Sequence, residues 1–142
     1  LFTLGYALQR RFVVLEILPP KSREKELEAV VAQLKRKGID VEEEEAKTIA
    51  EEAVDLIRVL RDATGRSLGL GITVDTAILA YEMVASKGVG DVGEAVQKAA
   101  VCTVLPQLEL VGEEVEEIVG KLKEKYEVVA EEIRRIGVFR RI

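Results

Sequence analysis

The sequence predicts a mainly α-helical fold with one β-strand near its N-terminal end. From about residue 21 onward, apolar residues recur every three or four positions, which is the spacing of one face of an α-helix. Before that, residues 12–18 form a nearly continuous apolar run rich in β-branched residues, which favours a buried strand. We therefore expect a single strand followed by a bundle of about five helices.

The composition narrows the classes of function. Of the 142 residues, 48% are apolar and 33% are charged, which is typical of a globular domain. The net charge of −5 argues against non-specific nucleic-acid binding by the whole chain. With no histidine and one cysteine, the chain lacks the ligands of an ordinary zinc site and the side chain most used for acid–base catalysis. The absence of Asn beside abundant Glu, Lys and Arg is a pattern reported for proteins of thermophiles.

The sequence also predicts where the protein works. No apolar run approaches the ~20 residues that a membrane helix needs, and no signal peptide is visible. Cys102 has no second cysteine with which to form an internal disulfide. We therefore expect a cytoplasmic protein with no membrane partner.

The predicted strand divides the chain. Residues 12–18 are followed by Pro19 and Pro20, which end the strand. An isolated strand cannot satisfy its backbone hydrogen bonds, so we expect its sheet to lie outside the sequence shown. The chain also starts at Leu1, without methionine, inside an amphipathic segment. We interpret it as a piece of a longer protein, with residues 1–20 belonging to a core and residues 21–142 forming a helical domain.

The first two helices are predicted from their apolar stripes and ends. The first carries apolar residues over residues 27–34 and is ended by Gly38. The second is expected to begin at Asp40, which forms a capping-box pattern with Glu43, and to end at Gly65. The stripe of this second helix consists of Ala46, Ile49, Ala50, Ala53, Ile57 and Leu60.

Three more helices are expected after a glycine-containing loop. Thr73 is the predicted N-cap of the third helix, which ends at Gly88. Asp91 begins the fourth, and Pro106 breaks or kinks its end. The fifth is expected to run as one helix from about Glu113. Its stripe consists of Val115, Ile118, Val119, Leu122, Tyr126, Val129 and Ile133.

Three features that could suggest chemistry have simpler explanations. The loop over residues 65–71 is rich in glycine, but it lacks the Gly-Lys-Ser/Thr ending of a phosphate-binding loop and follows a helix instead of a strand. The acidic run over residues 42–45 lies in the first turn of a helix, where the helix dipole favours negative charge. Cys102 follows a run of small apolar residues, which predicts a core side chain and not a nucleophile.

Two arginine clusters remain. Arg10 and Arg11 precede the buried strand directly, a costly place for charge unless it meets an anion. They are either surface cations with ion-pair partners or guanidinium groups presented to a phosphate, for which their planar, permanently charged heads are suited. The second cluster, over residues 134–141, is expected at a solvated helix end.

Two segments carry a resemblance to a known family. Residues 4–20, Leu-Gly-Tyr-Ala-Leu-Gln-Arg-Arg-Phe-Val-Val-Leu-Glu-Ile-Leu-Pro-Pro, resemble the end of the nucleotide-binding core of AAA+ ATPases. The similarity is to the branch of the McrB-type and MoxR-type motors, where a pattern near A-L-x-R-R-F precedes an apolar strand and a proline. Residues 99–108, Ala-Ala-Val-Cys-Thr-Val-Leu-Pro-Gln-Leu, resemble an element late in the McrB-type helical lid. The resemblance implies a last core strand from a truncated α/β core, within residues 1–20, and an all-helical lid over residues 21–142.

The resemblance also implies a function. AAA+ proteins form rings, here a homo-oligomer, in which each subunit hydrolyses nucleotide at the seam with its neighbour. By position, Arg11 would be the arginine finger and Arg10 its companion, both directed at the γ-phosphate of the neighbouring subunit's nucleotide. The nucleotide would be ATP or GTP with Mg²⁺, bound mainly by residues before Leu1. The 142-residue chain alone would therefore have no hydrolase activity.

Within the lid, the family often supplies a sensor arginine at the start of the third helix. No arginine occurs over residues 71–75 of this chain, and Arg66 is the nearest one. Arg66 and Thr73 are thus the lid's candidates for nucleotide contact. The substrate that the motor would remodel, a protein or DNA, is left open.

Two other classes of function compete with this interpretation. The first is a non-enzymatic helical module that binds partner helices through apolar grooves. The second is a helical nucleic-acid-binding domain that uses the arginine clusters, with affinity that falls steeply with salt. The acidic net charge and the low aromatic content of 4% argue against the second.

Overall fold

The computed structural model describes residues 22–110 and 112–141, with only the backbone described from residue 138 onward. This part of the chain forms six α-helices and one short 3₁₀-helix, and it contains no strand. The helices are α2 (Arg23–Arg36), α3 (Glu44–Thr64), α4 (Leu70–Ala85), α5 (Val92–Thr103), α6 (Gly112–Leu122) and α7 (Glu127–Arg141), with the 3₁₀-helix η1 (Leu105–Gln107) between α5 and α6. The predicted helical character is confirmed, whereas the strand expected at residues 12–18 lies outside the described residues.

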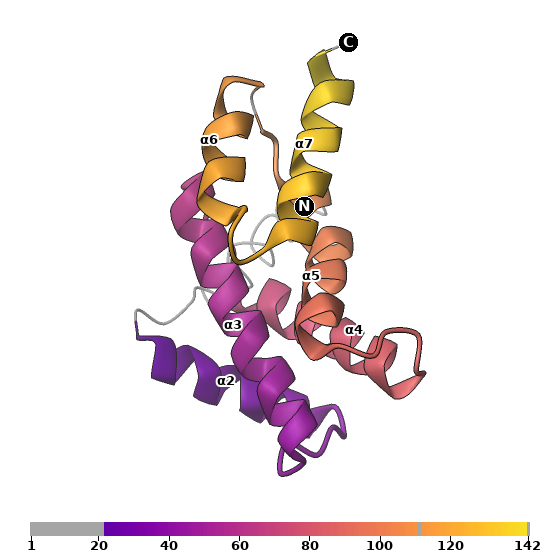
Figure 1. Cartoon of the computed structure of the whole chain (residues 1–142). Helices are drawn as coiled ribbons and strands as arrows, with labels where there is room; N and C mark the ends of the chain where they lie inside the picture. The colour runs from indigo at the N-terminus through magenta and orange to yellow at the C-terminus, as the bar shows by residue number, and fades with distance from the viewer. Residues whose placement is uncertain (1–21, 111, 142) are drawn as a thin grey trace, which may run out of the picture.

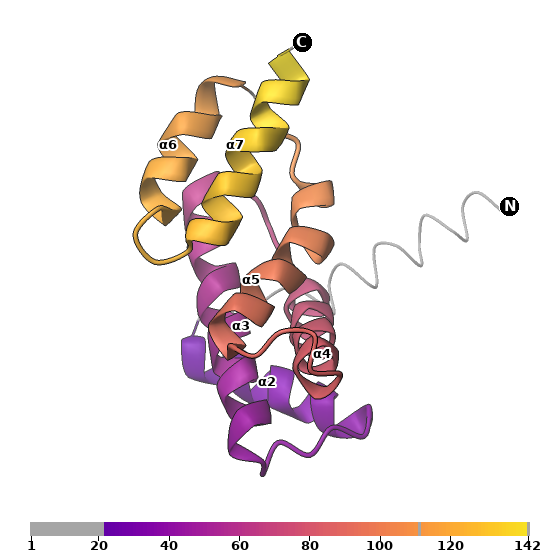
Figure 2. The same cartoon turned by 45° about the vertical axis from the view of Figure 1, so that its right-hand side comes forward.

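Helix α3, with 21 residues the longest of the six described, is the centre of the bundle. It packs against α2, α4, α5 and α6, and Figures 1 and 2 show these helices arranged around it. Its predicted stripe is buried, and Val54 and Leu56, on the two flanks of that stripe, are buried as well. Burial on more than one side explains why α3 connects both ends of the bundle.

Helices α4 and α5 share the most extensive contact among the described helices. Small residues face this contact, because Ala77 and Ala80 of α4 and Ala99 of α5 are fully buried. The hydroxyl groups of Thr76 and Thr103 lie 2.7 Å apart and join the two helices by a hydrogen bond. Buried small side chains such as these add dispersion contacts to that hydrogen bond.

The prediction of one long helix after Glu113 is wrong. The chain forms a hairpin of two helices, α6 and α7, which pack against each other. All the members of the predicted stripe are buried, but they belong to two helices that share one core. The turn contains neither glycine nor proline, and the apolar spacing from Leu122 to Tyr126 continues the helical period across it. Sequence periodicity therefore could not reveal the break.

A side chain from a distant helix caps the start of α7. The Gln97 side-chain oxygen accepts hydrogen bonds from the backbone N–H groups of Val128 and Val129, at 3.0 and 3.4 Å. These groups have no acceptor within the first turn of their own helix. A contact between residues about thirty positions apart therefore stabilises the hairpin turn.

The predicted helix starts were right at one position and wrong at two. Asp91 is the N-cap of α5, and its side chain accepts from the Glu94 N–H at 3.0 Å. Asp40 is not a cap, because its side chain accepts from the Glu42 N–H at 3.0 Å within a turn that delays α3. Thr73 is not a cap either, because α4 begins at Leu70, one turn earlier.

Cys102 also departs from its prediction, because it is exposed. Helix α5 buries the side that carries Ala99 and Ala100, and Cys102 lies outside that side. The apolar residues that precede Cys102 in sequence are therefore not its neighbours in the core. No helix in the described part of the chain combines the length and apolar content required to cross a membrane.

Candidate functional site

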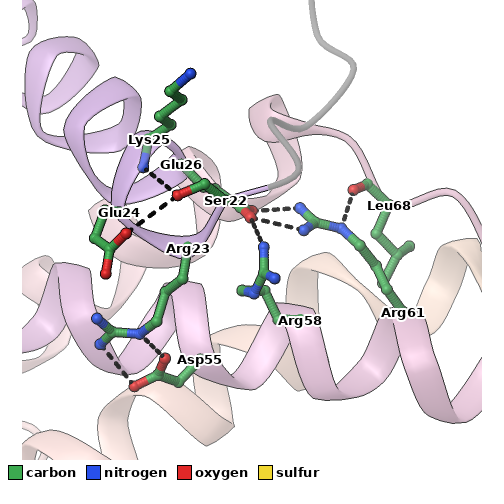
Figure 3. Close-up of polar contacts among 9 residues, drawn as sticks. All are labelled: Ser22, Arg23, Glu24, Lys25, Glu26, Asp55, Arg58, Arg61 and Leu68. Carbon is green, nitrogen blue, oxygen red and sulfur yellow. Dashed lines mark hydrogen bonds and ion pairs between the residues drawn. The ribbon is translucent and has the colours of Figure 1, made fainter.

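Three segments of the chain meet at one polar cluster. Glu26, near the start of α2, is bound by Arg58 and Arg61 from the second half of α3, and Arg61 also donates to a carbonyl in the loop before α4 (Figure 3). Glu26 and its two partners, Arg58 and Arg61, are called the junction cluster below. Glu26 is fully buried, although it is a charged residue. A buried charge is tolerated only when it is paired and hydrogen-bonded, so this group determines how the three segments fit together.

Arg61 makes most of the contacts. Its Nη2 and Nη1 atoms lie 2.5 and 2.8 Å from the two oxygens of Glu26, in a bidentate pair. Its Nε donates to the backbone carbonyl of Leu68 at 2.5 Å. The Arg61 side chain is only 14% exposed. One guanidinium group therefore links α2 to α3 and fixes the loop that leads into α4.

Arg58 is the second partner of Glu26, and its position is more open. Its Nη1 lies 3.1 Å from Glu26 Oε2, and its side chain is 33% exposed. One helical turn earlier, Arg23 of α2 pairs with Asp55 of α3, with distances of 2.6 and 3.1 Å. The hydrogen bond and the charge of Asp55 raise the pKa of Arg23. Because this second pair is partly solvated, it contributes at most about 1 kcal/mol.

Arg66, a sequence candidate for nucleotide contact, is engaged within the protein. Its Nη2 donates to the Glu109 carbonyl at 2.6 Å and lies 3.3 Å from a carboxylate oxygen of Glu114. Its Nη1 donates to the Thr64 carbonyl at 3.1 Å. Arg66 thus connects the end of α3 to the start of α6.

Thr73, the other lid candidate, is completely buried. Its hydroxyl group has no hydrogen-bond partner. The other threonines in the described helices donate to the carbonyl four residues earlier, namely Thr48, Thr64, Thr76 and Thr103. Thr73 is therefore the exception among them, and a ligand could meet its hydroxyl only after α4 had shifted.

The remaining sequence candidates are distributed differently. Arg10 and Arg11 lie outside the described residues. The acidic residues Glu43, Glu44 and Glu45 border an open hollow beside Thr48 and Val92. No group of three or more potential metal-binding side chains occurs among the described residues.

The junction cluster was not predicted from the sequence, although a signal exists. Glu26 lies four positions before Val30 and eight before Leu34, on the stripe that α2 buries. A carboxylate on a buried stripe needs a cationic partner. Arg58 and Arg61 in turn flank Leu60 on a helix that is buried on several sides. Because glutamate is common in this segment, the sequence does not distinguish the buried Glu26 from the exposed glutamates near it.

The comparisons with known proteins add no family to this description. No protein-family model matches the chain, and neither curated proteins nor solved structures gave a match. The chemistry of the residues is therefore the basis for any function assigned to it.

Proposed function

We propose that the chain is the C-terminal part of an AAA+ nucleotide-hydrolysing ring motor, with residues 21–142 as its helical lid. The motif around Arg10 and Arg11 carries this proposal, because it combines an arginine pair, an apolar run and a proline in the order that the family uses. The all-helical character of residues 22–110 and 112–141 supports it. Glu26 of the junction cluster lies four residues after Ser22, close to the proposed boundary between residues 1–20 and the lid.

In this proposal, the arginine pair acts on the neighbouring subunit. Bound nucleotide with Mg²⁺ supplies the phosphate that reacts. Arg11 presents a permanent positive charge to that phosphate, and such a charge stabilises the transition state more than the ground state. Arg10, its companion, is directed at the same phosphate.

The helical domain has a different task, which is to respond to the nucleotide. A change in the direction of the chain at Ser22 would turn the start of α2. Because Glu26 is bound to Arg58 and Arg61, that turn is passed to α3 and to the loop before α4. The lid would therefore move largely as one body.

Arg66 and Thr73 remain the lid's candidates for direct nucleotide contact. In the structure described, Arg66 is bound to Glu109 and Glu114, and Thr73 is buried. Each would have to leave its present surroundings to reach a nucleotide.

The test uses the longer protein that includes the segment before Leu1. We expect it to hydrolyse ATP or GTP and to form a ring. Arg11→Ala should abolish phosphate release while nucleotide binding is retained, and Arg36→Ala, at an exposed position of α2, should change neither. Mixing an Arg11→Ala subunit with one that cannot bind nucleotide should restore some turnover if the arginine acts across the seam. Unchanged turnover in Arg11→Ala would remove Arg11 from this role.

A non-enzymatic helical module is the second candidate, and α4 is the observation that favours it. Its only charged residues are Asp75 and Glu82, and many of its apolar side chains are only partly buried. These are Leu70, Ile72, Ile78, Leu79, Tyr81, Met83 and Val84. A longer protein without nucleotide binding or turnover would favour this candidate over the motor.

A further inference from the structure

The start of α4 lacks features that stabilise the other helix starts in the described part of the chain. Its N-cap residue, Gly69, offers no side-chain hydrogen bond, and its first turn contains no acidic residue. Each of the other five described α-helices has at least one acidic residue in its first turn. A second glycine, Gly71, lies within the first turn of α4, where glycine disfavours the helix. We therefore expect α4 to be weakest at residues 70–72.

The backbone hydrogen bond at this start is of a weaker type. The N-cap carbonyls of α2, α3 and α5 each accept from the N–H group four residues later, at 3.0, 3.1 and 3.0 Å. The Gly69 carbonyl accepts from Ile72, only three residues later, at 3.2 Å. A bond over three residues has the 3₁₀ geometry, which is poorer than that of the α-helix.

Unwinding the first turn of α4 would expose little apolar surface. Leu70 and Ile72 are only partly buried. A Cβ atom at Gly71 would meet nothing within 4 Å, so this position lies beside open space. Thr73 and Val74, in contrast, are buried. The bundle therefore holds α4 from residue 73 onward much more firmly than before it.

The hydroxyl group of Thr73 is left unsatisfied when the helix begins at Leu70. It is fully buried and has no hydrogen-bond partner among the described residues. In a helix that began one turn later, Thr73 would be the N-cap, and its hydroxyl oxygen would accept from the N–H of Asp75 or Thr76. The unwinding that breaks one helical turn therefore also satisfies a buried polar group.

A second hydroxyl group gains from the same change. Thr76 donates to the Ile72 carbonyl at 2.8 Å, and its hydroxyl oxygen lies 2.7 Å from that of Thr103. Thr103 in turn donates to the Ala99 carbonyl at 2.9 Å. The two hydroxyl groups thus have two hydrogen atoms for three contacts. Once Ile72 leaves the helix, the Thr76 hydrogen can serve the contact with Thr103 alone.

We propose that residues 70–72 form a two-state joint. In one state they are the first turn of α4, and in the other they are unwound and Thr73 is the N-cap of a shorter helix. Three residues span about 4.5 Å in a helix and about 10 Å when extended, so unwinding adds roughly 5 Å of chain before Thr73. Leu68 stays fixed, because it is buried and its carbonyl accepts from Arg61. The joint therefore lets α4 and α5 shift relative to α3 while the junction cluster stays intact, and it does not rest on the motor proposal.

The experiment is native-state hydrogen exchange on the 142-residue chain, measured residue by residue by NMR. In the shorter helix the N–H groups of Ile72 and Val74 lose their helical acceptors, whereas those of Ala77 and Ala80 keep theirs. We expect Ile72 and Val74 to exchange through a local opening, with protection about tenfold or more below that of Ala77 and Ala80. Equal protection of the four N–H groups would overturn the proposal.

Variants at Thr73 separate the joint from simple fraying of a helix end. Thr73→Val removes the hydroxyl group that caps the shorter helix, so the opening at Ile72 and Val74 should become about fivefold rarer. Thr73→Ser keeps a capping hydroxyl group and should open about as often as the natural sequence. Fraying does not depend on this hydroxyl group, so an unchanged opening in Thr73→Val would contradict the two-state joint.

Gly71→Ala tests the joint from the helical side and leaves Thr73 in place. Alanine favours the helix and its Cβ atom meets no neighbour, so the opening should become about three- to fivefold rarer. The matched control is Gly120→Ala in α6, where a Cβ atom also meets nothing within 4 Å. It should leave the exchange of Ile72 and Val74 unchanged. If both substitutions slowed this exchange equally, it would proceed through global unfolding and the joint would be excluded.

Discussion

Gly137 of α7 lies against Val115 of α6 so closely that no side chain fits between them. A Cβ atom at position 137 would lie 2.9 Å from both methyl groups of Val115, which is below normal contact distance. Gly137→Ala should therefore push the two helices of the hairpin apart and lower the free energy of unfolding by about 1–3 kcal/mol. Urea unfolding followed by circular dichroism measures this change.

The matched control is Gly120 of α6, where a Cβ atom would meet nothing within 4 Å. Gly120→Ala should raise the free energy of unfolding by about 0.5–1 kcal/mol, because alanine favours the helix and glycine does not. Equal effects of the two substitutions would contradict the close packing of α6 and α7.

The junction cluster predicts a large effect at a residue that looks like a surface glutamate. Glu26→Ala leaves two guanidinium groups without their buried carboxylate and should cost about 3–5 kcal/mol. Glu28→Ala, at an exposed position of the same helix, should change stability by no more than about 0.5 kcal/mol. Chemical unfolding of both variants measures the difference, and similar values for the two would show that Glu26 is not buried among cations.

For Thr73, we expect a substitution to change stability in the opposite direction. Its buried hydroxyl has no partner, so Thr73→Val removes an unsatisfied polar group and should leave stability unchanged or raise it by up to about 2 kcal/mol. Thr76→Val on the same helix removes hydrogen bonds to Ile72 and Thr103 and should lower stability by about 1 kcal/mol. Thermal unfolding of the pair measures both. A clear loss of stability in Thr73→Val would show that its hydroxyl has a partner.

The burial of Tyr126 leads us to expect that stability depends on pH in the alkaline range. Burial raises the pKa of its phenol, and the nearby Lys125 ammonium opposes this only in part. The folded state therefore favours the neutral phenol. Its contribution to stability is fully present below the pKa of about 10 in the unfolded chain and is lost as the pH rises through the higher folded value. Absorbance of the phenolate near 295 nm should rise at higher pH for Tyr126 than for an unfolded control. Tyr126→Phe should remove that late step and lessen the loss of stability above pH ~10.

The sequence predicted the parts of the fold that depend on local spacing. The stripe of α3 from Ala46 to Leu60 and the cap of α5 at Asp91 agree with the structure, because a period near 3.6 and a capping side chain act within one helix. The break between α6 and α7 was missed because the contact that stabilises it comes from Gln97, on another helix.

The candidate site was less predictable than the fold. The sequence drew attention to Arg66, whose donors are used by Thr64, Glu109 and Glu114. It did not draw attention to Glu26, because burial of one glutamate among many depends on how α2 crosses α3 and not on the residues beside it. Charged clusters of this kind are formed by tertiary contacts, so local patterns carry little information about them.

The contact between α2 and α3 at Arg58 lies far from the N-terminal end of α3. Between Arg58 and the first residue of the helix, Glu44, α3 advances by fourteen residues, or about 21 Å at 1.5 Å per residue. A rotation of about 10° around the junction would therefore carry the acidic start of α3 through roughly 4 Å. A pair of spectroscopic labels, one near Ser22 and one near Glu44, would report such a swing as a change in distance far larger than the local rearrangement that caused it.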